Sequence, residues 1–248
     1  MPVFAALAGL ITGSFLNVVA YRLPRGESLV TPGSHCIRCG TPVKPYDNIP
    51  VLGWLLLRGH CRQCHDRISS RYPIVEAATA LLAVAVVLNK NSTHDVVLGV
   101  LLVGVLVPVA LIDFDHRVIP NKITLPAAIV AIAAGLATRP SGVPEQLIAG
   151  AAGAGFLLVF ALAYPRGMGM GDVKLAGVLG LFLGRSVAVA LLVGVVAATV
   201  VGGAIIARVG VKDGRKTAVP FGPFLALGGV VAIFAGPSIV HWYLHTFA

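Results

Sequence analysis

The residues most able to do chemistry are two aspartates that border long apolar segments. Asp113 ends one such segment, and Asp172 begins another directly after Gly169-Met170-Gly171. The chain has only ten acidic residues, and an ionisable side chain at membrane depth is costly enough to suggest a function. Two facing carboxyl groups share a proton, so that one can activate water while the other polarises a scissile carbonyl. The pair therefore predicts an aspartic hydrolase, provided that the two segments meet.

Simpler structural roles remain open for these aspartates. Asp172 could be the N-cap of the helix that follows it. Asp113 and its neighbour Asp115 could be interfacial residues at a helix end, with Pro120-Asn121 beginning the next helix. The glycines before Asp172 fit a backbone that passes close to a substrate or another helix, but glycine is common in membrane helices.

Four cysteines form a second candidate site. Two CxxC pairs, Cys36/Cys39 and Cys61/Cys64, lie in the longest hydrophilic stretch of the chain. Two such pairs are typical of a four-thiolate zinc site, which is tetrahedral and leaves no open position for water. We therefore expect a structural zinc ion that folds this stretch. Nearby glycines would allow tight turns and nearby arginines would offset the negative charge: Gly40, Gly59, Arg38 and Arg62.

Other roles for the cysteines are weaker. Two disulfides would require an oxidising compartment, and a dithiol redox motif usually has a single CxxC. Three histidines beside the cysteines could replace a thiolate, although four cysteines already complete the shell: His35, His60 and His65.

The composition indicates the environment of the chain. Of 248 residues, 57% are hydrophobic and 12% are charged, whereas a soluble domain is about 25% charged. We therefore expect an all-α integral membrane protein in contact with membrane lipids. No cleavable signal peptide is evident, because no basic region precedes the first apolar run. We expect that run to be part of the mature protein.

About eight segments are long and apolar enough to cross a bilayer, which takes about 20 such residues. They cover residues 3–21, 73–89, 95–112, 123–138, 146–164, 172–184, 186–207 and 221–244. The sixth is short and rich in glycine, so we expect it to be tilted, broken or buried among its neighbours. These segments predict a polytopic protein with a hydrophilic loop between its first two helices.

The basic residues predict the orientation. Sixteen of the 19 Lys and Arg residues fall on one side of the predicted spans, and only Lys90, Arg139 and Arg185 fall on the other. Because Lys and Arg mark cytoplasmic loops, we expect the cysteine loop and both aspartates at the cytoplasmic face and both termini outside. This distribution accounts for the net charge of +9 without a nucleic-acid partner.

Six short motifs follow one another in a definite order. They are residues 13–19 (GSFLNVV) with 22–24 (RLP), 47–55 between the CxxC pairs, 70–76, Asp113 seven residues before Pro120, 169–174 (GMGDVK) and 220–224 (PFGPF). In order and spacing, over nearly the full length, they resemble the bacterial prepilin peptidases, which are GxGD-type aspartic membrane peptidases.

This resemblance implies that Asp113 and Asp172 are the catalytic pair, because the family's first aspartate stands seven residues before the proline, unlike Asp115. Family members act in the bacterial inner membrane on type IV prepilins or pseudopilins and cleave after a glycine. Many also N-methylate the new amino terminus with S-adenosylmethionine, an activity linked to the cysteine loop. This chain retains that loop, so the resemblance also implies methylation with S-adenosylmethionine.

We accordingly divide the chain into a first transmembrane helix (residues 1–21), a cytoplasmic zinc-binding loop (22–72) and a membrane-embedded aspartic peptidase core (73–248). One rival class is a transporter whose aspartates relay protons or cations, but no inverted repeat is evident. A non-enzymatic assembly factor is another, and the two intact aspartates argue against it. The sequence indicates neither an oligomeric state nor one particular substrate.

Overall fold

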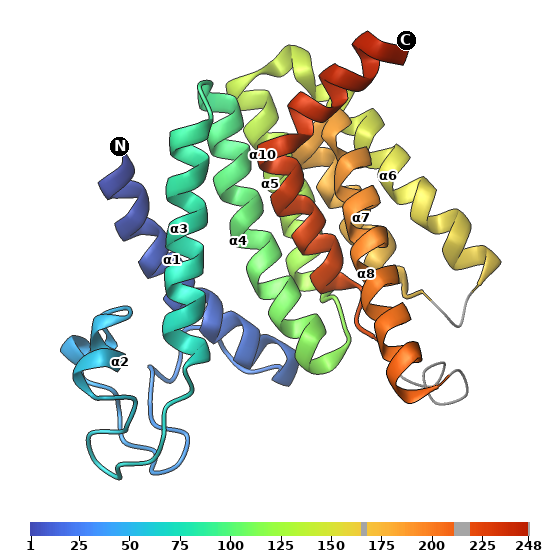
Figure 1. Cartoon of the computed structure of the whole chain (residues 1–248). Coiled ribbons are helices and arrows are strands. Elements are labelled where there is room, and N and C mark those ends of the chain that lie inside the picture. Colours follow the sequence, from blue (N-terminus) through green and yellow to red (C-terminus); the bar gives the residue numbers. More distant parts are fainter. Residues whose placement is uncertain (165–167, 211–218, 248) are drawn as a thin grey trace. The chain divides into compact units, whose positions relative to one another are not determined.

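The computed structural model describes residues 1–164, 168–210 and 219–247, and all long elements in these ranges are helices (Figure 1). The chain forms two compact units, Met1–Leu88 and Asn89–Ala248. Four of the predicted cytoplasmic basic residues lie outside the described ranges: Arg166, Lys212, Arg215 and Lys216.

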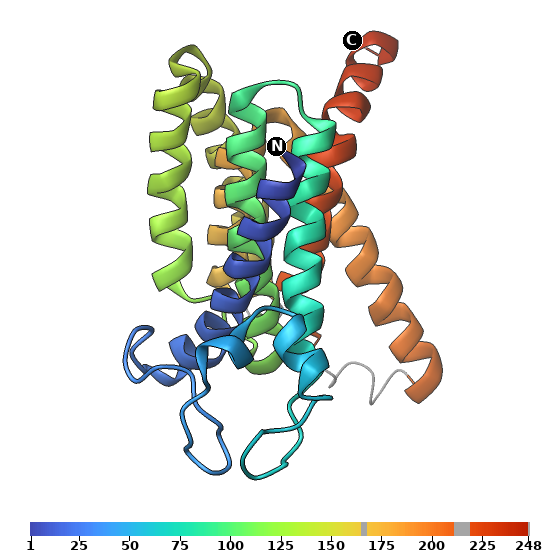
Figure 2. The same cartoon turned by 90° about the vertical axis from the view of Figure 1, so that its left-hand side faces the viewer.

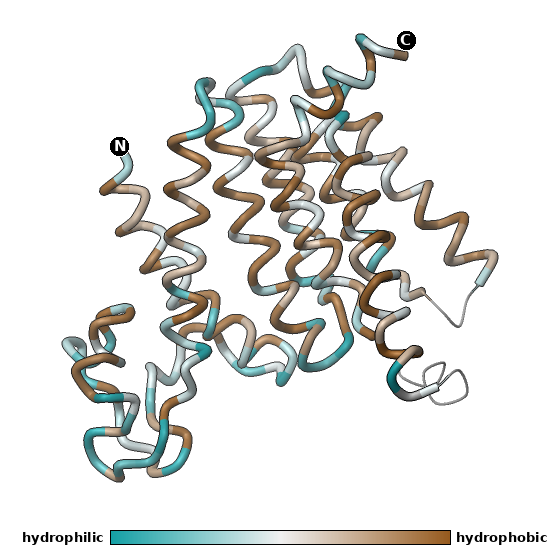
Figure 3. The backbone as a smooth tube through the Cα atoms, viewed as in Figure 1, coloured by the Kyte–Doolittle hydropathy of each residue, from teal (hydrophilic) through white to brown (hydrophobic). Residues whose placement is uncertain are grey.

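The first unit contains two long helices and the loop between them. The helices are α1 (Pro2–Arg22) and α3 (Arg71–Asn89), and the loop carries only short helical turns, among them α2 (Leu52–Leu56). Figure 2 shows the loop gathered beyond the ends of these two helices. In the hydropathy view the helices are mainly apolar and the loop is more polar (Figure 3).

The second unit is a bundle of helices. Its members are α4 (Thr93–His116), α5 (Asn121–Thr138), α6 (Val143–Ala163), α7 (Met170–Leu183), α8 (Val187–Val209) and α10 (Gly222–Phe247). Each of the eight predicted segments coincides with one helix of the chain, with ends that differ by a few residues. The all-α, polytopic architecture is therefore confirmed.

The number of spans differs from the expectation. Among the described residues, seven helical segments are long and apolar enough to cross a membrane when Met170–Arg208, which contains α7, the short turn Gly184–Ser186 and α8, is counted as one segment. With 14 residues, α7 is about 21 Å long, shorter than the hydrocarbon core of about 30 Å. Eight separate spans are therefore not established.

Helix α7 occupies the centre of the bundle. It packs against α4, α5, α6, α8 and α10, and it buries side chains around its whole circumference, including Val173, Leu175 and Leu181. A helix that is apolar on every side belongs in a core rather than at a surface. The expectation that this glycine-rich segment is buried among its neighbours is confirmed, and its first turn is thereby fixed in place.

In the first unit, two glycines allow α1 and α3 to approach closely. Gly9 and Gly13 form a GxxxG pattern, which brings helix backbones together in membranes. A Cβ at Gly9 would lie 2.6 Å from Cα of Ala80, and one at Gly13 would lie 2.8 Å from Cα of Glu76. Neither position has room for a side chain.

Buried polar side chains tie the loop to these two helices. Arg22 donates to the carbonyls of Ser28 and Gly33, and Glu76 accepts a 2.7 Å hydrogen bond from the amide of Val51. Val51 has φ 61° and ψ −52°, an uncommon conformation for a β-branched residue. The Glu76 carboxylate therefore holds a strained turn at the start of α2.

The α1–α3 contact generates a stability prediction. Gly13→Ala should destabilise the protein by about 1–3 kcal/mol, because the new Cβ meets backbone that cannot give way. Gly104→Ala is the matched control, since a Cβ there would meet nothing within 4 Å and alanine favours a helix. The measurement is the midpoint of thermal unfolding in detergent. A Gly13→Ala protein that melts at or above the wild-type temperature would contradict the close approach.

Candidate active site and metal centre

Asp113 lies in the last turn of α4 with its side chain buried. It is 5% exposed, whereas Asp115, two residues later, is exposed. The helix stops at His116 because Arg117 adopts the left-handed conformation and its N–H bonds to the Asp113 carbonyl, 2.9 Å away. Burial therefore distinguishes Asp113 from Asp115.

A backbone amide at the start of α10 holds the Asp113 carboxylate. The N–H of Gly222 donates to Oδ2 of Asp113 over 2.8 Å in a buried hydrogen bond. A Cβ at position 222 would lie 2.7 Å from that oxygen and 3.0 Å from Cγ, so only glycine permits this approach. The N-terminal end of a helix also carries partial positive charge. The carboxylate thus receives both a donor and a favourable field.

Asp172 occupies the first turn of α7 and is 9% exposed. Its Oδ2 accepts a 3.2 Å hydrogen bond from the amide of Gly169, and its own amide donates to the Gly169 carbonyl over 3.1 Å. The N-cap of α7 is therefore Gly169, and Asp172 stands at the third helical position, from which its carboxylate reaches back to the N-cap amide. The alternative that Asp172 is itself the N-cap is wrong in position, although the carboxylate does help to cap the helix.

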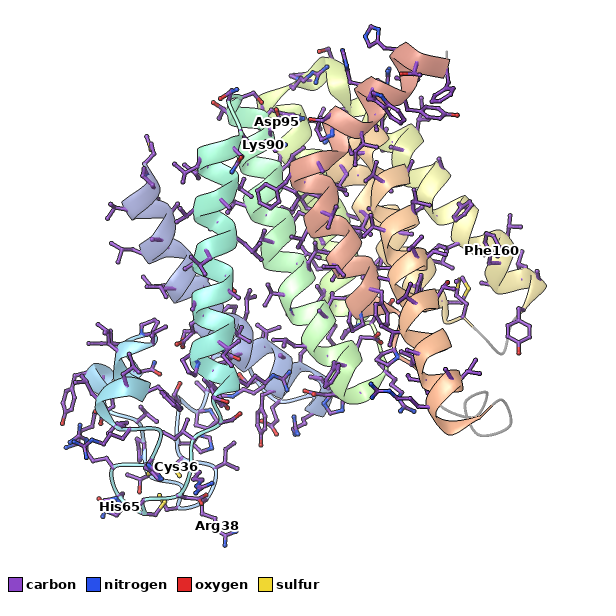
Figure 4. All side chains as sticks on the ribbon, in the orientation of Figure 1. Cys36, Arg38, His65, Lys90, Asp95 and Phe160 are labelled. Carbon is purple, nitrogen blue, oxygen red and sulfur yellow. The ribbon has the colours of Figure 1, made fainter. Side chains whose placement is uncertain are left out.

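The two predicted aspartates come together in the second unit. The last turn of α4 and the first turns of α7 and α10 lie at the same end of the bundle (Figure 1). Asp113 contacts the start of α10, and both α4 and α10 pack against α7, which carries Asp172 in its first turn. Figure 4 labels Lys90 and Asp95 near the opposite end of α4, which is about 27 Å from Asp113 for 18 residues of helix.

No ion pair involves either of these aspartates within the described ranges. Lys174, the basic residue nearest to Asp172 in the sequence, instead donates a 2.9 Å hydrogen bond to Oδ1 of Asn121. When no cation is nearby, two neighbouring carboxylates repel each other if both are ionised, and this repulsion favours a state in which the pair shares one proton. This is the charge state that an acid–base pair needs.

One of the two glycines before Asp172 has a steric role. A Cβ at Gly171 would lie 3.0 Å from Cβ of Ile119, a buried residue of the segment between α4 and α5. A Cβ at Gly169 would only reach Oδ2 of Asp172 at 3.4 Å, which is an ordinary contact. The close approach expected of this motif is therefore found at Gly171.

The four cysteines form a compact cluster in the loop of the first unit, near which Figure 4 labels Cys36, Arg38 and His65. Their sulfur atoms all lie within 4.8 Å of one another, and Sγ of Cys36 is 3.7 Å from Sγ of Cys64. A tetrahedral site with metal–sulfur bonds of about 2.3 Å places sulfurs about 3.8 Å apart. The cluster therefore has the dimensions to hold a metal ion.

The two CxxC turns have the same backbone hydrogen bonds. The amide of each first cysteine donates to the carbonyl five residues later, and the amide four residues later donates back to the cysteine carbonyl. That fourth residue has positive φ in both turns: 71° at Gly40 and 57° at His65. The turn expected at Gly40 is found, and His65 plays the equivalent part in the second pair.

The neighbouring polar residues have partners other than the sulfurs. The rings of His35 and His60 bond to the carbonyls of Gly33 and Arg58, and among the described residues only the four cysteines meet as metal ligands. Arg62 forms a bidentate pair with Asp47. These hydrogen bonds from Arg62 hold the pKa of Asp47 below its usual value.

The thiols of the cluster differ in acidity. Hydrogen bonds with the Thr41 side chain and backbone lower the pKa of Cys39 to about 6. At Cys64 a backbone hydrogen bond from Asp66 favours the thiolate, but desolvation and the neighbouring cysteine sulfurs raise the pKa to about 12. A bound cation would favour the thiolate at every position.

Two family models match the chain. The model described as Bacterial Peptidase A24 N-terminal domain matches residues 7–90, and that described as Type IV leader peptidase family matches residues 100–207. No solved structure matches.

Curated relatives match over nearly the whole chain. A prepilin leader peptidase/N-methyltransferase of Aeromonas salmonicida is 34% identical, over 97% of this chain and 92% of the relative. A protein of the same name from Pseudomonas aeruginosa is 32% identical, over 96% and 91%. One from Myxococcus xanthus is 40% identical, over 73% of this chain and 56% of the relative.

The contact between Gly222 and Asp113 generates a prediction about catalysis. If Asp113 belongs to the active site, Gly222→Ala should lower peptide hydrolysis about 100-fold, because the new Cβ would displace its carboxylate and a shift of about 1 Å in an active site has that effect. Gly202→Ala is the control, since a Cβ there would meet nothing within 4 Å. The measurement is the hydrolysis rate of purified variants with matched unfolding temperatures. Equal rates for the two variants would remove Gly222 from the site.

The cysteine cluster generates a prediction about metal content. Elemental analysis of the purified protein should find about one transition-metal ion per chain, because four thiolates make one closed site. Changing Cys36 and Cys39 together to serine should remove it. His35→Ala should retain it, since that ring bonds to a carbonyl instead. A metal-free wild-type protein would refute the site.

Proposed function

This chain belongs to the type IV leader peptidase family, and from that premise we propose that Asp113 and Asp172 catalyse removal of the leader peptide from type IV prepilins or pseudopilins. The observation that supports the assignment is that both carboxyl groups are buried, that of Asp113 at the end of α4 against the start of α10 and that of Asp172 in the first turn of α7. Membership of a peptidase family also decides against the transporter alternative.

In the proposed reaction one carboxylate takes a proton from water while the other, protonated, donates a hydrogen bond to the scissile carbonyl oxygen. The water oxygen then bonds to the carbonyl carbon, and the C–N bond breaks as the leaving nitrogen accepts a proton. Gly222 keeps Asp113 in place through a bond that needs no side chain. Cleavage after a glycine in the substrate follows the family pattern that the motifs of this chain resemble.

We further propose that the protein lies in the bacterial inner membrane with the cysteine loop and the aspartates at the cytoplasmic face. The distribution of basic residues supports this orientation. The three-part division into residues 1–21, 22–72 and 73–248 follows the same scheme, with the peptidase core in the last part.

For the cysteine cluster we propose a structural zinc ion. Four sulfurs within 4.8 Å of one another are a donor set that suits zinc, and a closed shell gives the ion a role in folding the loop. The relatives are named N-methyltransferases as well as peptidases. We therefore propose that this chain also methylates the new amino terminus, with S-adenosylmethionine as the methyl donor.

The catalytic assignment predicts the behaviour of three variants. Asp113→Asn and Asp172→Asn should each reduce leader cleavage by several orders of magnitude, because one carboxyl group cannot serve as both acid and base. Asp115→Asn is the matched control, and its exposed side chain should make it mild. Mass spectrometry of a purified prepilin, with and without S-adenosylmethionine, reports cleavage and methylation together. An active Asp113→Asn protein beside an inactive Asp115→Asn protein would reverse the assignment.

The proposed orientation predicts the outcome of reporter fusions. Fusions in residues 22–72, 113–122, 165–171 and 208–218 should report the cytoplasm, and those at 90–95 and at the C-terminus should report the outside. The reason is the excess of basic residues, sixteen of 19, on one side. Fusions that place the segments near Asp113 and Asp172 on opposite faces would separate the two carboxyl groups by a bilayer.

A further inference from the structure

The first unit contains a pocket that the peptidase reaction does not use. It has a volume of about 320 Å³ and lies between one side of α1 and the loop segments around residues 29–34 and 48–50. Its lining changes in character along α1, from Ile11 and Phe15 to Arg22 at the end of the helix. The pocket is therefore amphipathic.

The charged end of the pocket is a buried guanidinium. Arg22 is 7% exposed, and its side chain donates hydrogen bonds to two neutral carbonyl oxygens, those of Ser28 at 3.0 Å and Gly33 at 3.2 Å. No carboxylate in the described part of the chain forms an ion pair with it. A buried charge is costly unless it is paired, so Arg22 lacks an anion.

The other polar residues around the pocket suit an anion with several oxygen atoms. Ser34 and Asn48 line it from the loop, and Ser14 lines it from α1. They add hydroxyl and amide donors to those of the guanidinium, whereas no acidic residue is in the lining. Arginine is the side chain that pairs most readily with phosphate, through its fork of N–H groups.

The apolar end of the pocket opens on a helix that is long and apolar enough to cross a membrane. Ile11 is 66% exposed and Phe15 is 50% exposed, so lipid chains can contact both. Val30, 81% exposed, adds apolar surface from the loop. A molecule that fills both ends must combine an apolar chain with an anionic head at the depth of the membrane surface.

We propose that this pocket binds an anionic phospholipid, with its phosphate on Arg22 and its acyl chains along Ile11 and Phe15. The lipid supplies the anion that the guanidinium lacks and completes the contact between α1 and the loop. Arg22 acts on the loop from one side through the carbonyls of Ser28 and Gly33 and on the lipid from the other. Basic pockets at the cytoplasmic ends of membrane helices bind lipid headgroups by the same chemistry.

The test is a binding measurement on the full chain in detergent. Native mass spectrometry counts molecules of phosphatidylglycerol that stay bound to the wild type and to Val30→Glu, which adds a negative charge beside the pocket and leaves Arg22 intact. Ile37→Glu is the matched control, because Ile37 is an exposed apolar residue of the same loop outside the lining. Arg22→Gln tests the guanidinium directly, and an unfolding temperature for each variant identifies any misfolded protein.

The wild type and Ile37→Glu should retain one phosphatidylglycerol with equal affinity. Val30→Glu and Arg22→Gln should bind it about fivefold or more weakly, since one basic residue at a membrane surface contributes about 1 kcal/mol. Equal retention by the wild type and Val30→Glu would overturn the proposal. Glycerol phosphate binding as tightly as the lipid would show a free-phosphate site instead. S-adenosylmethionine binding that depends on Arg22 and displaces the lipid would also overturn it.

Discussion

A carboxylate buried at the end of a membrane helix persists only when a donor or a proton accompanies its charge, and the arrangement of the second unit follows from this constraint. Asp113 meets the first amide of α10, and Asp172 meets the amide that caps α7. Both donors belong to helix starts, where free N–H groups and the dipole favour negative charge. Glycine at positions 222 and 171 removes the side chains that would hold these segments apart.

In the first unit, the buried charged side chains are stabilised by backbone groups of the loop instead. Its two buried ionic side chains, Arg22 and Glu76, are 7% and 6% exposed, and each bonds to the backbone of the intervening loop. The loop is thus tied to α1 and α3 at its root, while the cysteine cluster closes it farther out. The buried aspartates and the buried charges that hold the loop thus belong to separate polar networks, one in each unit.

Much of this was predictable from the sequence. Hydropathy located the helices because lipid imposes one simple requirement on a whole segment, and CxxC spacing located the sulfur cluster because the ligands are local. Asp113 and Asp172 were chosen by motif. Gly222 could not be assigned a role, since its contact joins residues 109 positions apart. The turn at Val51 and the pairing of Arg62 with Asp47 likewise depend on tertiary contacts. Hydropathy alone did not determine the number of spans, because only a short turn separates the apolar helices α7 and α8.

The central claim is that the carboxyl groups of Asp113 and Asp172 meet, and proximity cross-linking tests it most directly. The full chain, in native membranes, carries Asp113→Cys with Asp172→Cys and is treated with a short bifunctional thiol reagent, and mass spectrometry identifies the joined peptides. Asn121→Cys with Lys174→Cys is the positive control, because those side chains are 2.9 Å apart. The account predicts comparable cross-linking of both pairs. Efficient linkage of 121 to 174 with none between 113 and 172 would contradict it.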